Sequence, residues 1–441
     1  MENCNKNILL FGAGKSATVL INYLLKQSIN KKWLLTLADA DYNLAKHKLN
    51  NHPNGKAIAL DINKDEERTK AIQQADIVIS MLPPSLHFIV AKDCVLYKKN
   101  LLTASYLDDR IKSLEKEIVN NNLLFICEMG LDPGIDHMSA MQMIDTIHIK
   151  GGNITSFISH CGGLIAPESD DNPWHYKITW NPANVVNAGK DGAIFKENNK
   201  IVEADYHNIF KNCNTVVVPG IGTLAWYPNR DSTGYARLYG LQNASTFIRT
   251  TLRHPDFCTG WQSVIQAGLT KTNDQIEANN IARWFELKLK ESGFDNFEDF
   301  LLKAVDIDDR NLIRTTFNYL GLNSMENIPS ALTNSAKILQ YLLETKLQLY
   351  EKDKDMIVML HEMEYVLNNE KKSKKSYLIV RGDDASNTAM AKTVGVPLAI
   401  ATEMILEKKL ALKGLFIPTT AEIYNPVLKK LKETNIVFEE L

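Results

Sequence analysis

The stretch EMGLDPGIDHMSAM, which begins at Glu128, places turn-forming and ionisable residues between two apolar runs. Its Pro133-Gly134 step fixes one backbone angle and then allows close approach, so the chain can pass beside a flat ligand. Asp132 and His137 are the side chains there that could orient a substrate or move a proton. The alternative is structural: Asp132 and Asp136 would cap the helix that follows, and His137 would only pack.

A glycine turn near the start of the chain, in NILLFGAGKSATVL, is a second candidate site. It has the form G-x-G-x-x-A between an apolar run and a helical pattern, the context in which such a turn binds a dinucleotide. The first glycine permits the turn, the second lets a pyrophosphate approach, and free N–H groups at the helix start bind the anion. The residues expected to contact the cofactor are Gly12, Ala13, Gly14, Lys15, Ser16 and Ala17.

Asp39 ends the next apolar run, where a carboxylate can accept hydrogen bonds from both ribose hydroxyls and would repel a 2′-phosphate. This position predicts NAD as the cofactor and disfavours NADP. A helix N-cap is the alternative role for Asp39, and Asp41 could perform either role. Asp61 and Ile62, at the end of a third predicted strand, would lie beside the adenine.

Two arginines lie in turn-rich loops of the second half of the chain, Arg230 in WYPNRDSTGY and Arg253 in FIRTTLRHPDF, which also contains Thr251. An arginine held in a loop suits bidentate recognition of a carboxylate, so the pair indicates an acidic substrate. We expect Cys161 to be a small buried thiol and not a nucleophile.

No metal site is expected. The candidate ligands fit no common spacing pattern, and neighbouring residues of a strand point to opposite faces. The ligands considered are Asp136, His137, His160 and Cys161.

Six predicted strands alternate with helical patterns in the first 128 residues. The first strand is Ile8–Phe11, and the others end near Asp39, Asp61, Pro83, Tyr106 and Glu128. Such alternation with short connections predicts a doubly wound, Rossmann-like parallel sheet with helices on both faces. Because ligands bind beyond the carboxyl ends of the strands, Ser105, Tyr106 and Asp132 would lie close to the cofactor.

The pattern changes after residue 128. Residues 129–270 and about 350–390 read as a second α/β domain, and the charged helical patterns of residues 271–349 predict a small helical subdomain between them.

The formal charge of −2 and the absence of a basic block disfavour a nucleic-acid partner. Neither a leader pattern nor an apolar run of membrane-spanning length is apparent, and the six cysteines stand singly. A cytoplasmic protein with no membrane contact is expected.

Taken together, these motifs resemble the L-glutamate-forming saccharopine dehydrogenases (saccharopine reductases). The matching phrases are GAGKSA, TASYL, GLDPGIDHM, SHCGGLIAPESDDNPWHYKITW, YPNRDS, TLRHPDF, DMIVM and AMAKTVGVP. They extend over nearly the whole chain, and GLDPGIDH and CGGLIAPE are specific to the family. The resemblance implies that about residues 390–441 complete the sheet of the first domain. It also implies a homodimer whose contacts lie in the second domain.

The resemblance also implies roles for individual residues. Asp132 and Tyr106 would lie nearest the reaction. The substrate would contact Ser105, Tyr106, Asp132, Arg230, Thr251, Leu252 and Arg253, and the cofactor would contact Leu131, Asp132 and Pro133. The family serine that follows a tryptophan is replaced here by Asn181, beside the cofactor. Fungal relatives that make lysine have an arginine where this chain has Ala38-Asp39-Ala40, so the resemblance also favours NAD and lysine degradation.

The implied reaction is the oxidative cleavage of saccharopine with NAD⁺ and water to L-glutamate and 2-aminoadipate 6-semialdehyde. Asp132, His137 and Lys177 are candidates for proton transfer, and the general base is left unassigned. Alternatives are an NADP-dependent enzyme that runs in the lysine-forming direction and a reductive coupling enzyme like carboxynorspermidine synthase. A catalytically silent NAD sensor is also considered, and the retained substrate groups disfavour it.

Overall fold

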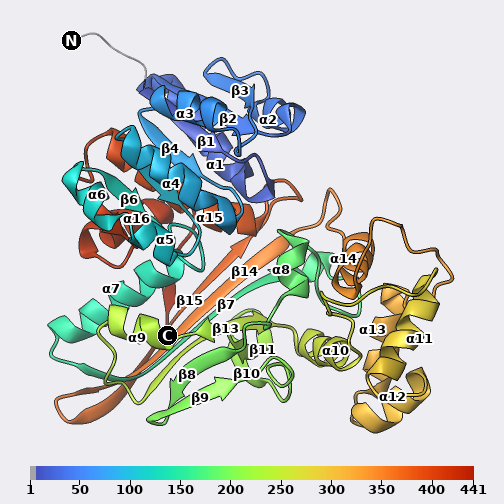
Figure 1. Cartoon of the computed structure of the whole chain (residues 1–441). Helices are drawn as coiled ribbons and strands as arrows, with labels where there is room; N and C mark the ends of the chain where they lie inside the picture. The colour runs from blue at the N-terminus through green and yellow to red at the C-terminus, as the bar shows by residue number, and fades with distance from the viewer. Residues whose placement is uncertain (1–5) are drawn as a thin grey trace. The chain divides into compact units, whose positions relative to one another are not determined.

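The computed structural model describes residues 6–441 and divides the chain into two compact units (Figure 1). The first unit runs to Gly152 and is completed by Leu378–Phe438, and the second comprises Asn153–Tyr377 with Glu439–Leu441. The expected boundaries lie near residues 128 and 390, whereas the two units divide after Gly152 and before Leu378. The first difference arises from the helix after Gly134. That helix belongs to the first unit because Asp145 accepts a hydrogen bond from the hydroxyl of Tyr424.

The first unit contains a parallel sheet of seven strands in the order β16-β6-β5-β4-β1-β2-β3. This order confirms the doubly wound fold, in which the chain reverses direction beside β1. The strand from the C-terminal part, β16, extends the sheet by pairing with β6. The bounds are β1 Lys6–Phe11, β2 Trp33–Asp39, β3 Gly55–Ala59, β4 Ile77–Ser80, β5 Asn100–Thr103, β6 Leu124–Ile126 and β16 Gly414–Phe416.

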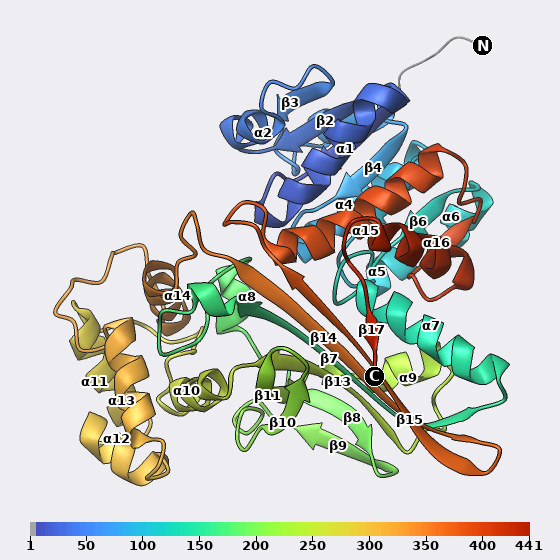
Figure 2. The same cartoon turned by 180° about the vertical axis from the view of Figure 1, so that it is seen from behind.

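Helices cover this sheet, and α15 packs beside α1 although the two lie far apart in the sequence (Figures 1 and 2). A Cβ on Gly395 of α15 would lie 2.7 Å from the backbone nitrogen of Leu20, so this close crossing requires glycine. The helices are α1 Thr18–Lys31, α2 Tyr42–Leu49, α3 Asp65–Gln73, α4 His87–Leu96, α5 Asp109–Lys112, α6 Glu115–Asn120, α7 Ile135–Ile149, α15 Ala389–Leu406 and α16 Ala421–Lys432.

By length and composition alone, α15 could cross a membrane, and it is the only helix of residues 6–441 that could. However, 72% of this helix is buried inside the protein. Its apolar residues pack against α1 and α16 in the first unit. The apolar character of α15 is therefore explained by its place in a core.

The second unit is built on a mixed sheet of ten strands, whose main path is β10-β11-β13-β7-β14-β15-β17. Strands β7 and β13 are parallel, and β14 runs antiparallel to β7 over nearly its whole length. The bounds are β7 Asn153–Ile165, β8 Ala193–Glu197, β9 Lys200–Ala204, β10 Asn214–Val218, β11 Gly222–Pro228, β12 Arg230–Asp231, β13 Thr246–Arg253, β14 Asp355–Leu367, β15 Glu370–Arg381 and β17 Glu439–Glu440.

Helices α11 to α14 occupy the segment expected to be a separate helical subdomain. Three of them begin at asparagines whose side chains accept a backbone N–H: Asn280, Asn296 and Asn334. Their apolar side chains join one continuous core with those near the sheet, so they form part of the second unit. The helices are α8 Pro182–Val186, α9 Thr233–Leu238, α10 Pro255–Gln266, α11 Ile281–Glu291, α12 Phe297–Ala304, α13 Arg310–Leu320 and α14 Ser335–Lys346.

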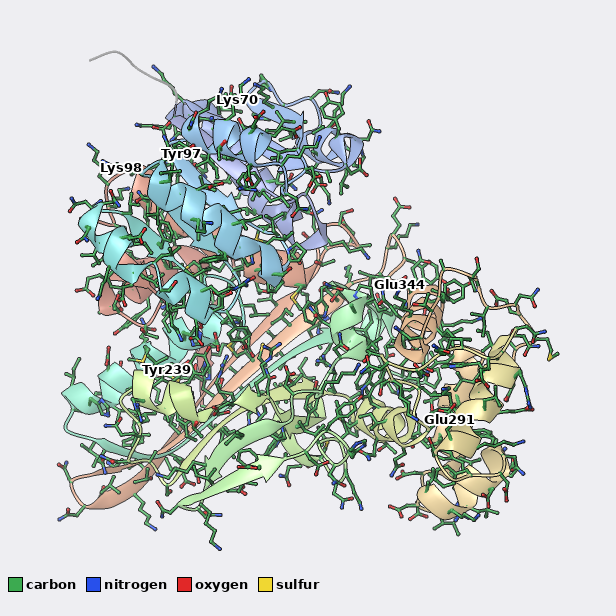
Figure 3. The ribbon with its side chains drawn as sticks, in the orientation of Figure 1. Lys70, Tyr97, Lys98, Tyr239, Glu291 and Glu344 are labelled. Carbon is green, nitrogen blue, oxygen red and sulfur yellow. The ribbon has the colours of Figure 1, made fainter. Side chains whose placement is uncertain are left out.

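Charged side chains of both signs lie at the surfaces of the two units. In Figure 3 the labelled Lys70 and Lys98 are exposed in the first unit, and Glu291 and Glu344 are exposed in the second. By contrast, the labelled Tyr239 is buried, with its ring against Phe157 and Phe247.

Candidate functional site

The glycine turn lies at the carboxyl end of β1, in the place where this fold binds a dinucleotide. Gly12 has a φ of +97°, and a Cβ there would lie 2.8 Å from the carbonyl oxygen of Met81. Only glycine fits this position without strain. Around Gly14 no atom lies within 4 Å of where a Cβ would be, so its backbone is open to a ligand.

The carboxylate of Asp39 links β2 to this turn. Its Oδ2 accepts a hydrogen bond from the backbone N–H of Ala13 at 2.7 Å, and Oδ1 accepts one from the N–H of Asp41 at 2.9 Å. The helix cap that was the alternative role for Asp39 is supplied by Asp41, which accepts the N–H of Leu44. Asp39 therefore remains at the position expected for ribose recognition.

Positive charge also gathers beside the turn. Lys48 donates a hydrogen bond to the hydroxyl of Thr18 at 2.5 Å, and burial together with the charge of Lys15 lowers the pKa of Lys48. A negative ligand would relieve this repulsion.

Asp61 and Ile62 follow β3, as the sequence suggested. The carboxylate of Asp61 accepts the backbone N–H of Asn63, which makes a local turn. The side chain of Ile62 packs into the core of the first unit, and its carbonyl accepts a hydrogen bond from Arg68. An adenine contact by the Ile62 side chain is therefore disfavoured.

The loops that follow β5 and β6 are joined by backbone and side-chain hydrogen bonds. The N–H of Glu128 donates to the carbonyl of Ser105, and Oε1 of Glu128 accepts the N–H of Leu107 at 3.0 Å. Between these bonds, the hydroxyl of Tyr106 donates to Oδ1 of Asp132 at 3.2 Å. The structure thus brings Ser105, Tyr106 and Asp132 together at the carboxyl ends of the strands, as expected.

Gly134 and Asp136 lie at the start of α7, where the structural alternative placed Asp132 and Asp136 as helix caps. Asp132 does not cap the helix, whose N-cap is Gly134. Oδ1 of Asp136 accepts the N–H of Gly134 at 2.6 Å. A Cβ on Gly134 would lie 2.1 Å from the carbonyl oxygen of Gly130, so the tight loop admits only glycine. The Asp132-Pro133 peptide bond within this loop is cis.

His137 is fully buried, and its Nε2 lies 2.8 Å from Oε2 of Glu128. Its other ring nitrogen lies 3.6 Å from Asp136. Because the ring is fully buried and its Nε2 is hydrogen-bonded to Glu128, His137 fits the structural alternative better than proton transfer. Glu128 holds the neighbouring loop through one oxygen and His137 through the other, a role that the sequence analysis missed.

The substrate residues proposed for the second unit differ in exposure. Arg230 is exposed in β12 with a φ of +55°. On β13, Thr251 is partly exposed, whereas Leu252 is fully buried. The guanidinium of Arg253 is buried against the rings of Tyr176 and Phe257 and donates to the carbonyl of Leu252 at 2.8 Å. A substrate contact by the Leu252 side chain is therefore disfavoured.

Arg249 was missed by the sequence analysis, although it lies in the same strand. It is buried, and its guanidinium lies 4.3 Å from the centre of the Tyr235 ring. Burial of an arginine requires partners that a single sequence does not reveal.

Lys177 is a poor candidate for a general base. It is buried, and its ammonium group donates to Asp171 at 2.8 Å and to Asp353 at 2.7 Å. Burial alone would lower the pKa of Lys177, but these two hydrogen bonds outweigh it and raise the pKa. Asn181 caps α8 by accepting the N–H of Ala183 at 3.0 Å, so its expected cofactor contact would compete with that cap.

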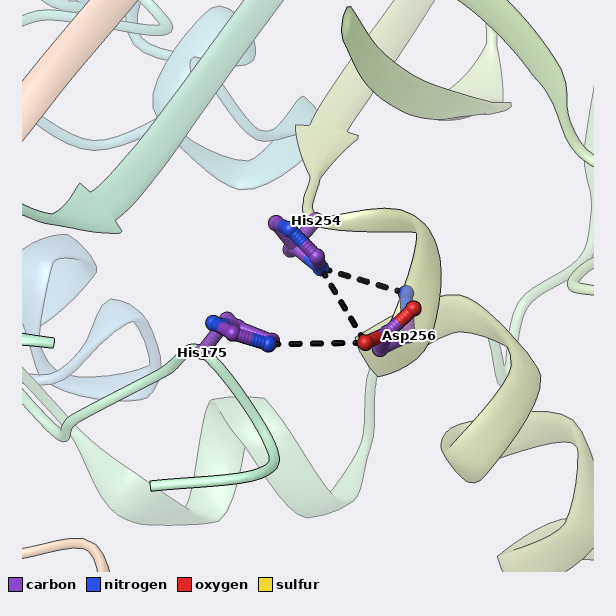
Figure 4. Close-up of side chains that lie close together, drawn as sticks. All are labelled: His175, His254 and Asp256. Carbon is purple, nitrogen blue, oxygen red and sulfur yellow. Dashed lines mark hydrogen bonds and ion pairs between the residues drawn. The ribbon is translucent and has the colours of Figure 1, made fainter. Parts of the chain in front are cut away.

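One group of His, Cys, Asp and Glu side chains in residues 6–441 is close enough to hold a metal ion: His175, His254 and Asp256. Both rings direct a nitrogen at the carboxylate of Asp256 (Figure 4). The ring centroids of His175 and His254 lie 3.8 Å apart with a 30° angle between the ring planes, and Nδ1 of His254 accepts the N–H of Asp256. This arrangement is explained by contacts within the cluster, and the absence of a metal requirement stays a prediction.

Comparison with known families assigns both parts of the chain. A model described as the saccharopine dehydrogenase NADP binding domain matches residues 8–126, and one described as the saccharopine dehydrogenase C-terminal domain matches residues 130–436. The saccharopine dehydrogenase [NADP(+), L-glutamate-forming] of Saccharomyces cerevisiae is 34% identical, with 97% of each chain covered.

Longer proteins match as well. The alpha-aminoadipic semialdehyde synthase of Arabidopsis thaliana is 33% identical over 98% of this chain, but the match covers 44% of the synthase. The chain thus spans less than half the length of such synthases. Among solved structures, the apo saccharopine dehydrogenase (L-Glu forming) of Saccharomyces cerevisiae has a TM-score of 0.90, 32% identity and 99% coverage of both chains.

Proposed function

Because the chain belongs to the saccharopine dehydrogenase family, we propose that it oxidatively cleaves saccharopine to L-glutamate and 2-aminoadipate 6-semialdehyde. One observation carries the proposal: the Tyr106-Asp132 hydrogen bond lies at the carboxyl ends of β5 and β6, in the unit that contains the glycine turn. A parallel sheet of this order binds its ligands at that edge.

A bound nicotinamide dinucleotide would supply the acceptor for a hydride from the ε-carbon of the lysine-derived part of saccharopine, the carbon that becomes the aldehyde of 2-aminoadipate 6-semialdehyde. The substrate amine loses its proton, the C–N bond becomes an imine, and water adds to the imine carbon and releases the two products. Asp132 orients the substrate through a carboxylate whose position is held by Tyr106. The residue that removes the amine proton is not assigned, since Lys177 and His137 are occupied by carboxylates.

We also propose a preference for NAD and a role in lysine degradation. Asp39 supports this preference because it lies at the end of β2 and because its neighbours from Ala38 to Asp41 include no arginine. A carboxylate there repels a 2′-phosphate. NADP and the lysine-forming direction remain the rival assignment. It is favoured by the positive charge of Lys15 and Lys48 and by the names of the fungal relatives.

One assay tests the reaction and the cofactor separately. Purified protein is mixed with saccharopine and either NAD⁺ or NADP⁺, and the absorbance of the reduced cofactor is followed. We expect reduction of NAD⁺ at the higher kcat/KM. No reduction of either cofactor would refute the reaction, and a higher kcat/KM with NADP⁺ would refute the argument from Asp39.

Arg230 is proposed to hold a substrate carboxylate. Arg230→Ala should therefore raise the KM for saccharopine roughly tenfold and leave kcat within about twofold, because loss of one charged hydrogen bond costs about 1.5 kcal/mol. Arg237→Ala, an exposed arginine on α9, is the matched control. An unchanged KM in Arg230→Ala would remove Arg230 from the substrate site.

The proposed homodimer and cytoplasmic location rest on the family resemblance and on the single cysteines. Sedimentation velocity at micromolar concentration tests the first, and a monomer would refute it. Microscopy of a fluorescent fusion in the native cell tests the second.

A further inference from the structure

His87, the first residue of α4, lies buried between two serine hydroxyls of the first unit. Its Nδ1 is 2.8 Å from Oγ of Ser80, which ends β4. Its Nε2 is 2.7 Å from Oγ of Ser105, in the loop after β5. The histidine side chain thus connects the core of the sheet to a residue of the candidate substrate site.

The Ser80 hydroxyl fixes which ring nitrogen carries the hydrogen. Ser80 is fully buried, and within residues 6–441 the hydrogen-bond partner of its hydroxyl is Nδ1 of His87. A buried hydroxyl that donates to no acceptor loses about 1 to 3 kcal/mol. Ser80 therefore donates to Nδ1, and in the neutral ring the hydrogen is on Nε2.

The Nε2 hydrogen then points at Ser105. Nε2 also lies 3.5 Å from the hydroxyl oxygen of Thr103, a longer contact than its contact with Ser105, and this oxygen accepts the backbone N–H of Ser105 at 3.2 Å. With Nε2 as donor, Oγ of Ser105 accepts, and its own hydrogen is left to donate elsewhere. Thr103 holds the backbone of the same residue, so both parts of Ser105 are fixed.

The charge state of His87 agrees with this arrangement. Burial lowers the pKa of His87 to about 4, with smaller and opposite effects from Asp108 and Arg110. The ring is therefore neutral at neutral pH, when one nitrogen can accept from Ser80 and the other can donate to Ser105.

We propose that His87 is a positioning residue that holds the Ser105 hydroxyl as a hydrogen-bond donor to a carboxylate oxygen of the substrate. The hydrogen bonds run from Ser80 to His87, from His87 to Ser105, and from Ser105 to the substrate. The part that concerns substrate rests on the proposed function, whereas the state of the ring does not.

Nitrogen NMR of protein with isotope-labelled histidine tests the ring state without any assay of activity. The resonance is assigned by its loss in His87→Gln. We expect a neutral ring with hydrogen on Nε2 from pH 6 to 8, and Ser80→Ala should shift the population towards the other tautomer. Hydrogen on Nδ1, or a charged ring in this range, would overturn the proposal.

Kinetics test whether His87 acts through Ser105. His87→Asn, whose amide is too short to reach Ser105, should raise the KM for saccharopine roughly tenfold and change kcat less. His87→Gln, whose amide can donate in place of Nε2, should recover most of this loss. In a Ser105→Ala background, His87→Asn should change KM less than twofold, because the hydroxyl that it positions is gone.

These outcomes distinguish a positioning role of His87 from a general structural role and from failure of the proposed function. His87→Asn could instead raise the KM for saccharopine as much in the Ser105→Ala background as in the wild type. That result would mean a general structural role for His87 and would overturn the proposal. If the wild-type protein does not oxidise saccharopine at all, the proposed function fails, and the NMR result alone decides the ring state. Circular dichroism of each variant shows whether it is folded before its KM is interpreted.

Discussion

At the scale of single residues, the polar side chains of the candidate site in the first unit are held by hydrogen bonds to neighbouring residues. Tyr106 donates to Asp132, Glu128 bridges a loop and a helix, and His87 bridges two serines. These hydrogen bonds hold each side chain in one orientation. Such prior ordering lowers the entropy that binding must remove.

The Tyr106-Asp132 bond can be tested alone. Tyr106→Phe removes the donor and leaves the ring, so Asp132 loses its fixed orientation. We expect kcat/KM for saccharopine to fall roughly tenfold, the equivalent of about 1.4 kcal/mol. Tyr97→Phe, a partly buried tyrosine in the same unit, should leave kcat/KM unchanged. A wild-type kcat/KM in Tyr106→Phe would show that Asp132 is oriented by other contacts.

His87 also predicts how stability depends on pH. Its pKa is about 4 when folded against 6.5 for an ordinary histidine, so the unfolded chain binds the extra proton between these values. The contribution of His87 to the free energy of unfolding is therefore fully present above pH 6.5 and is lost as the pH drops towards 4. Between pH 7 and pH 5 the wild type should lose about 2 kcal/mol more free energy of unfolding than His87→Gln.

Urea denaturation at both pH values measures this difference. His148→Gln, an exposed histidine on α7, should behave as the wild type does. Equal pH dependence in His87→Gln and the wild type would show that His87 does not resist protonation.

Some site residues could be predicted from sequence and others could not, for physical reasons. Gly12, Asp39 and Asp132 stand at the ends of apolar runs, and the parallel sheet alone brings strand ends together. His87 and Glu128 act through side-chain contacts with residues of other loops. Such contacts produce no periodic pattern in the sequence. Leu252 and Ile62 were placed at the ligand, but their apolar side chains pack into cores.

At the scale of elements, one buried carboxylate joins three helices of the first unit. Glu403 of α15 accepts hydrogen bonds from Lys31 and Tyr23 of α1 and from Lys430 of α16. Burial alone would raise the pKa of Glu403, but these bonds outweigh it and hold the pKa at about 2. The charged form of Glu403 is therefore the one that stabilises the folded state.

Glu403→Gln should lower the free energy of unfolding at pH 7 by roughly 2 kcal/mol, because the two lysines lose their shared partner. The stabilisation by Glu403 is complete above pH 4.5 and is lost as pH falls towards 2, so the difference from wild type should shrink at pH 3.5. Denaturation by urea at both pH values measures it, and Glu422→Gln, exposed on α16, is the control. If wild type and Glu403→Gln differed in free energy of unfolding by the same amount at pH 7 and pH 3.5, the charge of Glu403 would not contribute to stability.

Elements were easier to predict than their grouping. The alternating strands of the first sheet and the asparagine-capped helices α11, α12 and α14 have local signals in the sequence. The place of α7 in the first unit depends on contacts with α16, far away along the chain. Such contacts leave no mark in the sequence near α7.

At the scale of the whole molecule, the first unit is discontinuous. Its sheet needs β16, and its core needs α15 and α16, which follow residues 153–377 of the second unit in the sequence. Removing residues 407–441 should therefore abolish folding of the first unit. Ile423, Val427 and Leu431 of α16 are buried, and losing about 2 kcal/mol for each takes away much of a typical domain stability.

Cofactor binding, followed by protein fluorescence, measures this effect. Removal of residues 439–441, which include only the short β17, is the control and should leave binding unchanged. Wild-type affinity in the longer deletion would show that the N-terminal part folds without its C-terminal strand.

The discontinuity has a consequence during biosynthesis. The outer edge of β6 has no partner until β16 leaves the ribosome, and the 287 residues from 127 to 413, which include residues 153–377 of the second unit, are translated in between. At about 5 to 20 residues per second, this takes roughly 15 to 60 seconds. Throughout that interval the nascent chain carries an open, apolar strand edge, the kind of surface that chaperones shield from aggregation. Synonymous codons that slow translation of residues 153–377 should therefore reduce the yield of soluble protein.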